Sequence, residues 1–247
     1  MDLEYAKEAF EKFVLKYDLD NNKKPLKGKY IHTYKVIELM NELALSLKLS
    51  QEETDLAVLI ALLHDIGRFP QYEKYKTFRD KNSVDHANLS VDYLFRDNHI
   101  RDFIKDDKYD PVIKNAILNH NKLELIKETD DLFAKMIRDV DKIDIFRVYS
   151  VREDSLVFDV NQITTEVLDS FKIEEPIKYD LIKTKTDVTI LTLGFVFDFY
   201  FNESFEILVK SNNFEMFLES IEVKKGSEEL FDQIKEICIT KIKKGVV

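Results

Sequence analysis

The chain has 247 residues, which suits one large domain or one domain with an appended subdomain. Its formal net charge of −10 argues against general binding of nucleic acids or anionic membranes, although a local basic site can still bind a small anion. The 5 glycines and 4 prolines are few, and so few helix-breaking residues favour long helices over many short strands.

Three features of the sequence predict a cytoplasmic protein with no membrane partner. The one cysteine, Cys238, cannot form an intramolecular disulfide, which is typical of a reducing compartment. The N-terminus lacks the basic and apolar regions of a signal peptide. No stretch approaches the roughly 20 apolar residues that cross a membrane.

Apolar residues at intervals of three and four predict the first two helices. We expect a helix over residues 3–17 and another from about 31 to 47, joined by a polar loop over 18–28. His32 precedes Val36 by one helical turn, so it shares the apolar face of the second helix. This helix therefore presents a histidine to the interior.

A capping box of Ser50 and Glu53 predicts the start of the third helix. The helix is expected to end at the adjacent pair His64 and Asp65, on an apolar run. Gly67 is the expected stop, because only glycine takes a positive φ without strain just past a helix end. Two metal-ligand residue types therefore lie side by side where a buried helix ends.

The segment over residues 68–82 begins at this point with Arg68 and has little apolar periodicity, so we expect an irregular connection. It is locally positive in an acidic chain. Two interpretations remain open, namely a phosphate-binding lid and an ordinary solvated loop.

Two further helices are expected to carry histidines. One starts at Ser83 and includes His86 on its apolar side. The next is opened by Asp110 as N-cap with Pro111 at the first helical position, and it carries His120.

The last helix of this half is predicted to begin at Asp130, and it places Asp141 and Asp144 on an apolar stripe. Buried carboxylates are costly unless something charged meets them. The stripe therefore indicates a charged partner for these two side chains.

Motifs are sparse in the C-terminal part. Residues 151–180 are expected to be irregular or weakly helical, and helices are expected over 187–200, 203–222 and 227–243. No clear linker separates this part from the rest. We therefore expect a single domain, 1–247, with a C-terminal helical extension over about 151–247 packed on the site-bearing bundle.

Six residues with metal-ligand side chains fall on or at the ends of the expected helices: His32, His64, Asp65, His86, His120 and Asp141. Imidazole and carboxylate suit Fe, Mn, Zn or Ni. One such histidine is more often a hydrogen-bonded core residue, but four of the chain's 5 histidines share this placement. His99 is left out because its neighbours are polar. Asp65 can bridge two cations, since each carboxylate oxygen can take one.

These residues carry a resemblance to a known family. His32, the His64-Asp65 pair and Asp141 match the H…HD…D signature of the HD-domain phosphohydrolase superfamily over about residues 27–148. The sequence is most similar to small stand-alone members with an HDIGRF-type motif. The resemblance implies an all-α, HD-domain-like helical bundle that binds divalent metal ions and hydrolyses phosphomonoesters or phosphodiesters, commonly of nucleotides.

The resemblance also extends to the metal number. His86 and His120 look like the two extra histidines of the binuclear subset, which includes HD-GYP cyclic-dinucleotide phosphodiesterases. The chain has no Gly-Tyr-Pro motif, Asn121 stands where that group usually has a second histidine, and Arg68 stands where it commonly has a lysine. We therefore expect two metal ions but not a cyclic dinucleotide substrate.

Roles for individual residues follow from the resemblance. It selects Asp141 as the metal ligand and leaves Asp139 beside the ligands. Lys142, which follows Asp141, is either a phosphate contact or a solvated helix residue. In the expected mechanism a metal-activated hydroxide attacks phosphorus, while Arg68 and Lys142 neutralise the phosphoryl oxygens.

Two alternatives remain open at this stage. The first is a mononuclear nucleotidase that uses His32, His64, Asp65 and Asp141 only. The second is a regulatory protein that binds a nucleotide without catalysis. In all of these interpretations the partner is a small phosphorylated molecule, and a nucleotide is expected.

Overall fold

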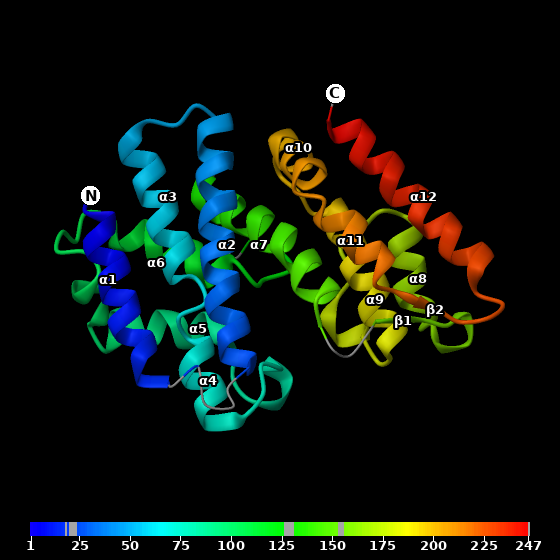
Figure 1. The fold of residues 1–247 in the computed structure, drawn as a ribbon, viewed down its shortest axis with the longest axis horizontal. Coiled ribbons are helices and arrows are strands. Elements are labelled where there is room, and N and C mark those ends of the chain that lie inside the picture. The colour runs from blue at the N-terminus through cyan, green and yellow to red at the C-terminus, as the bar shows by residue number, and fades with distance from the viewer. Residues whose placement is uncertain (18, 20–23, 126–130, 153–155, 247) are drawn as a thin grey trace. The chain divides into compact units, whose positions relative to one another are not determined.

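A computed structural model describes residues 1–17, 19, 24–125, 131–152 and 156–246, and helices dominate it (Figure 1). The predicted all-α class is confirmed. The strands of the described residues, β1 (Val157–Phe158) and β2 (Glu222–Val223), form a two-stranded parallel pair. The chain divides into two compact units, Met1–Asp141 and Lys142–Val247. That the C-terminal part packs on the site-bearing bundle remains a prediction.

The N-terminal unit is built around α3, which is apolar on nearly all sides and therefore central. Helix α2 packs along it, α1 and α6 also contact it, and α5 contacts α4 and α6. The elements of this unit, with η for 3₁₀-helices except the π-helix η3, are α1 (Leu3–Val14), η1 (Leu15–Tyr17), α2 (Lys24–Ser46), α3 (Gln51–Leu63), α4 (Arg68–Tyr75), η2 (Asp80–Asn82), α5 (His86–Val91), η3 (Asp92–Arg96), η4 (His99–Asp102), α6 (Asp110–Asn119) and α7 (Leu132–Ser150), which continues into the second unit.

Helix α2 begins earlier than the sequence indicates. The loop expected over 18–28 lies partly outside the described residues, and from Lys24 onward the chain is already helical. Pro25 lies in the first turn, where its missing N–H removes no helical hydrogen bond. A proline interpreted as a loop residue is thus the start of the helix that carries His32.

Of the helix starts expected at Ser50, Ser83 and Asp110, the first is confirmed and the other two are displaced. The capping box of Ser50 and Glu53 is confirmed. Helix α5 is capped by Asp85 rather than by Ser83, because the Asp85 carboxylate accepts the N–H of Ala87 at 2.9 Å. Helix α6 already includes Asp110 as its first residue.

The predicted start of α7 at Asp130 lies outside the described residues. The neighbouring Asp131 carboxylate accepts the backbone N–H of Ala134 at 3.1 Å. A carboxylate one position later in the sequence therefore caps the beginning of this helix.

The segment over 68–82 is also more regular than expected. Its first part is the helix α4, which ends at Lys76 in a left-handed conformation with φ 55°. The prediction of an irregular connection is therefore wrong for this part, because a short amphipathic helix of polar residues gives little apolar periodicity.

The C-terminal unit contains the end of α7 and a second set of helices. Phe146 of α7 forms an aromatic cluster with Phe195, Phe214 and Phe217 at ring-centroid distances of 5.3–6.2 Å. Besides the strands, its elements are η5 (Val160–Gln162), α8 (Thr165–Lys172), η6 (Tyr179–Leu181), α9 (Lys185–Leu193), η7 (Gly194–Phe197), α10 (Asn202–Ser211), α11 (Asn213–Glu219) and α12 (Glu228–Gly245).

The helices predicted for this unit are confirmed with changed boundaries. The helix expected over 187–200 is α9 followed by η7. The helix expected over 203–222 is divided at Asn212, which adopts φ 59° between α10 and α11. Cys238 of α12 is buried, and its thiol donates to the carbonyl of Leu193.

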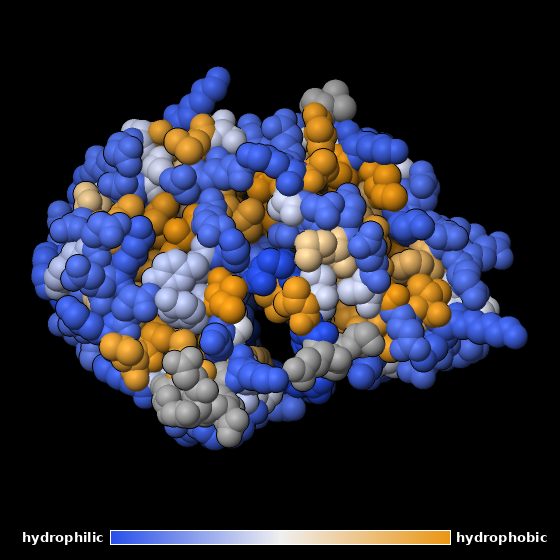
Figure 2. All heavy atoms as spheres, viewed as in Figure 1, coloured by the Kyte–Doolittle hydropathy of each residue, from blue (hydrophilic) through white to orange (hydrophobic). Residues whose placement is uncertain are grey.

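Charged and polar side chains cover much of the face shown in Figure 2, with apolar residues scattered among them. None of the helices in the described part of the chain is both long enough and apolar enough to cross a membrane. The cytoplasmic location remains a prediction.

The expected role of Gly67 is wrong. Helix α3 ends at Leu63, and Gly67 has φ −66°, so no positive φ is needed. The glycine is required instead by close packing. A Cβ at this position would lie 2.6 Å from the backbone nitrogen of Ser90 and 2.7 Å from the carbonyl oxygen of His86.

We expect Gly67→Ala to lower the free energy of unfolding by about 1–3 kcal/mol, because the new methyl group overpacks a backbone contact. Gly28→Ala is the matched control. None of the described residues lies within 4 Å of a Cβ at Gly28, so this change should raise the free energy of unfolding by about 0.5–1 kcal/mol through helix propensity. Urea unfolding of both variants measures the difference, and equal effects would contradict the packing argument.

Candidate metal centre

The structure brings the six predicted ligand residues together in the N-terminal unit. We call them the histidine–aspartate cluster, and they are His32 on α2, His64 and Asp65 after α3, His86 at the start of α5, His120 after α6 and Asp141 on α7. Their side chains are almost completely buried, and Asp141 is the most accessible at 15%. Residues from five helices thus converge on one small volume.

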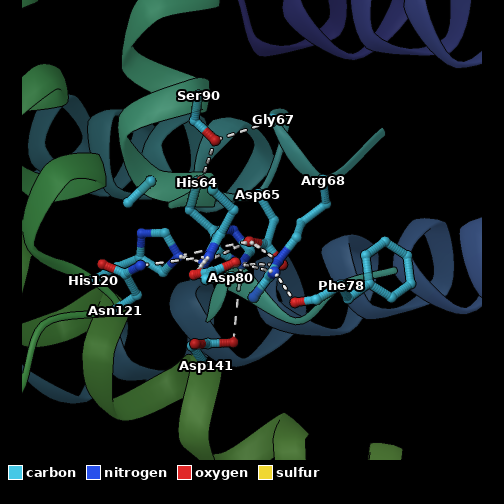
Figure 3. A network of polar contacts seen from close by, with 12 residues as sticks. His64, Asp65, Gly67, Arg68, Phe78, Asp80, Ser90, His120, Asn121 and Asp141 are labelled. Carbon is cyan, nitrogen blue, oxygen red and sulfur yellow. Dashed lines mark hydrogen bonds and ion pairs between the residues drawn. The ribbon is translucent and has the colours of Figure 1, made fainter. Parts of the chain in front are cut away.

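Asp65 lies at the centre of the cluster (Figure 3). Its Oδ2 lies 3.7 Å from the Nε2 atoms of both His32 and His64. Its Oδ1 lies 3.5 Å from Nε2 of His86 and 3.6 Å from Nε2 of His120. The two oxygens of one carboxylate therefore face two different pairs of imidazoles.

The cluster divides into two groups of three ligand atoms that lie within 4.8 Å of one another. The first triad is His32, His64 and Asp141, in which Asp141 Oδ1 lies 3.1 Å from His32 Nε2. The second triad is Asp65, His86 and His120. Three protein ligands are what catalytic metal sites commonly provide, with further positions left for water or substrate.

Helix ends orient two of the imidazoles. His64 and His120 each follow the last residue of a helix, and each donates its Nδ1–H to a carbonyl of that helix, Ala61 at 2.7 Å and Ile117 at 2.6 Å. These carbonyls have no intrahelical partner, so the contact also satisfies the helix end. The arrangement leaves Nε2 of each ring as the acceptor that points into the cluster.

The donor set fits a cation. The Nε2 atoms of His86 and His120 lie 2.9 Å apart, so their lone pairs would repel unless a cation or proton is shared between them. Among the described residues, His64 Nε2 and Asp65 Oδ1 are buried with no hydrogen-bond partner. Such atoms are costly in a protein interior, and metal coordination would satisfy them.

Burial and neighbouring charges set the protonation of the cluster. Burial lowers the pKa of His64 from 6.5 to about 4 and outweighs the opposite effect of Asp65 and Asp141. Burial, together with the Arg68 charge, lowers the pKa of His86 to about 4. Both imidazoles are therefore neutral near pH 7, which is the form that binds metals.

Lys29 is a site residue that the sequence analysis missed. Its ammonium lies 2.6 Å from Asp65 Oδ2, and the side chain is 20% exposed. Burial would raise the pKa of Asp65, but the Lys29 ammonium holds it well below its usual range. Lys29 lies one helical turn before His32 on the same face of α2, but the helix expected from about 31 did not include it.

The predicted substrate contact Arg68 also lies beside Asp65. Its Nε is 3.5 Å from Asp65 Oδ1, and its Nη1 donates to the carbonyl of Phe78 at 2.7 Å. The Phe78 ring centroid lies 5.9 Å from both the Arg68 and the Lys29 cations. Two partly exposed cations thus flank the central carboxylate.

The remaining predicted residues lie elsewhere. Lys142 belongs to the C-terminal unit, and its ammonium pairs with Asp198 of that unit at 2.9 Å. Its role as a phosphate contact remains a prediction. Asp139 is fully buried. His99 is 41% exposed and stacks on Tyr93, in agreement with its exclusion from the site.

Asp144, which shares the apolar stripe with Asp141, meets the charged partner that the sequence indicated. Its two oxygens accept hydrogen bonds from Arg147 Nε at 2.6 Å and Nη2 at 2.8 Å. The bidentate contact offsets part of the cost of burying this carboxylate.

Arg138 of α7 supports the end of α6 that presents His120. Its guanidinium, only 1% exposed, donates to the carbonyls of Asn119 and Leu123, both at 3.1 Å, and to that of Lys122. A cation at a helix C-terminus satisfies carbonyls that lack partners and interacts favourably with the helix dipole.

Comparison with known proteins identifies one family. Residues 30–145 match the family model described as HD domain. No curated protein and no solved structure matches the chain. The matched range contains all six residues of the cluster and confirms the resemblance seen over about residues 27–148.

We expect the metal-free protein to lose stability as the pH falls from about 6.5 to about 4. In this window the unfolded chain binds protons on His64 and His86 that the folded chain excludes, and a shift from 6.5 to about 4 corresponds to about 3 kcal/mol per histidine. Urea unfolding across this range in EDTA measures the slope. His64→Gln should flatten the slope and the exposed-site change His99→Gln should not; an unchanged slope in His64→Gln would contradict the assignment.

We expect Arg138→Met to lower the free energy of unfolding by about 3 kcal/mol or more, because buried carbonyls lose a charged donor. The control Arg96→Met removes an exposed pair with Asp92 and should change stability by less than about 1 kcal/mol. Denaturant unfolding compares the two. A small effect at Arg138 would show that water replaces its hydrogen bonds.

Proposed function

Residues 30–145 form an HD domain, the domain of a superfamily of metal-dependent phosphohydrolases, and we propose that this protein is such an enzyme with a binuclear site. Its proposed substrate is a small phosphorylated molecule, a nucleotide, cleaved at a phosphomonoester or phosphodiester bond. The acidic surface makes a long nucleic acid an unfavourable substrate.

One observation carries the proposal of two metals. Each oxygen of the Asp65 carboxylate faces its own pair of Nε2 atoms, with distances of 3.7 Å on one side and 3.5–3.6 Å on the other. A carboxylate in this position can bridge two cations. A site for one metal would leave His86 and His120 with their lone pairs 2.9 Å apart and no cation to share.

The residues of the two triads would hold the metals. Divalent ions of Fe, Mn, Zn or Ni bound there would supply hydroxide at neutral pH and polarise a phosphoryl oxygen. The backbone carbonyls of Ala61 and Ile117 keep the imidazoles of His64 and His120 in the acceptor form, and burial keeps His64 neutral. The protein's own contribution is therefore a fixed and buried set of ligands.

Arg68 and Lys29 are the proposed contacts to the substrate anion. Both cations flank Asp65, and both side chains remain partly exposed at 14% and 20%. The planar guanidinium of Arg68 can hold two phosphate oxygens, and the ammonium of Lys29 is a compact point charge. Charge that develops on the phosphoryl group would be neutralised by these cations.

The test is the metal content of protein purified without chelator, measured by elemental mass spectrometry. We expect about two first-row metals per chain in the wild type and about one in His86→Ala, because the second triad loses a ligand. His99→Ala is the matched control, since that histidine is exposed and outside the cluster, and it should keep two.

Other results would change the proposal. About one metal in both wild type and His86→Ala would favour a mononuclear nucleotidase. Two metals without turnover of nucleoside monophosphates, cyclic nucleotides or simple aryl phosphate mono- and diesters would favour a nucleotide-binding regulator. Protein that holds no metal after reconstitution with Mn, Fe, Zn and Ni would contradict the proposal that it is a metal-dependent enzyme.

A further inference from the structure

Asp80 joins a proposed metal ligand to a proposed substrate contact. It lies at the start of η2, between α4 and α5. Its Oδ2 lies 2.6 Å from Nδ1 of His86, and its Oδ1 accepts from Nη1 of Arg68 at 3.0 Å. One carboxylate thus contacts both the proposed metal ligand His86 and the proposed substrate contact Arg68.

We propose that Asp80 is a positioning residue that fixes His86 in the second triad and thereby controls binding of the second metal. The inference rests on the proposed function, because it concerns the occupancy of the same site. Asp80 contacts neither Asp65 nor His120 in this role; it acts through the imidazole of His86.

The imidazole of His86 is oriented differently from those of His64 and His120. His64 and His120 are oriented by carbonyls of their own helices, at sequence separations of three residues. Their orientation therefore comes with the helix. The orienting acceptor of His86 is instead a side chain from the preceding segment, so this ligand depends on the placement of that segment.

The segment places Asp80 firmly. Gln71, which is fully buried, donates from Nε2 to Asp80 Oδ1 at 2.8 Å, to Ser83 Oγ at 2.9 Å and to the carbonyl of Val84 at 2.9 Å. The α4 residue Arg68 also donates to Gln71 Oε1 at 3.0 Å. These bonds hold the carboxylate with Oδ2 directed at His86.

The consequence for the ring follows from ordinary histidine chemistry. A carboxylate accepts the Nδ1–H, fixes this tautomer and leaves Nε2 as a stronger ligand. In the structure that Nε2 faces Asp65 Oδ1 at 3.5 Å. Without Asp80, the neighbour of Nδ1 is the side-chain nitrogen of Asn121 at 3.4 Å, an amide donor that favours a proton on Nε2 instead.

A direct ligand role for Asp80 fits the distances less well. Asp80, Asp85 and His86 do form a group that could hold an ion. The 2.6 Å between Asp80 Oδ2 and His86 Nδ1 is, however, a hydrogen-bond distance. Two ligands that each lie about 2.0–2.2 Å from one zinc ion are normally farther apart than this.

The test is Zn²⁺ binding to Asp80→Asn, measured as zinc per chain at buffered free Zn²⁺ and as affinity by chelator competition. We expect the weaker of the two zinc sites to lose affinity by about 10–100-fold, as for loss of other groups that orient ligands, while the first site is unchanged. Asp102→Asn is the matched control, because it breaks an exposed Asp–His contact of 3.0 Å to His99, and it should bind zinc as the wild type does.

The first zinc also reports whether the variant is folded. Two zinc ions at wild-type affinity in Asp80→Asn would overturn the inference and leave the proposed function intact. Loss of both zinc ions would overturn it too, because Asp80 would then support the whole site. A wild type that binds one zinc or none is a failure of the binuclear proposal and is seen before any variant is made.

A second measurement needs no variant. In zinc-loaded wild type with ¹⁵N-labelled histidine, long-range ¹H–¹⁵N spectra distinguish metal-bound from protonated ring nitrogens. We expect His86 to bind zinc through Nε2 and to carry a proton on Nδ1. Zinc bound through Nδ1 would overturn the inference, because the Asp80 contact could not then exist.

Discussion

The N-terminal unit depends on the placement of one buried carboxylate. Asp65 is 3% exposed, and a negative charge so far from water is tolerated only when positive or polarisable groups surround it. The surroundings here are the Lys29 ammonium at 2.6 Å and four imidazole nitrogens at 3.5–3.7 Å. Helix α2 contributes two of these groups, Lys29 and His32, and α3, α5 and α6 contribute one each, so the packing of the unit brings them to this point.

The ends of two helices orient two of the imidazoles in the cluster. A helix leaves its last carbonyls without partners, and a histidine placed just beyond the end can donate to one of them. His64 and His120 both do so, and the same bond that completes the helix also directs the free nitrogen inward. A buried arginine supports α6 in a similar way, since Arg138 donates to the carbonyl of its last residue, Asn119, and to that of Leu123 beyond its end. The hydrogen bond that satisfies a carbonyl at the helix end therefore also orients the metal ligand.

The sequence was informative where side-chain type and periodicity coincide. Four histidines on apolar faces and an adjacent aspartate were sufficient to identify the cluster, because helical spacing places such residues inward. Lys29 and Asp80 were not found, for different physical reasons. Lys29 falls between the loop expected over 18–28, which contains Pro25, and the helix expected from about 31, although proline is tolerated in a first helical turn and α2 begins at Lys24. Asp80 acts through a contact between segments, and no periodicity in one segment reports such a contact.

Gly67 is another position whose structural constraint lies in contacts between segments and not in its own local sequence. Its torsion angles are open to any residue, so the restriction at this position comes from its neighbours, the backbone of Ser90 and of His86. Because those neighbours are backbone atoms, no exchange of a side chain elsewhere makes room for a larger residue at 67. In evolutionary terms the position has no simple compensating substitution. Any lineage that changed it would have to shift the start of α5, and the imidazole of His86 would move with it.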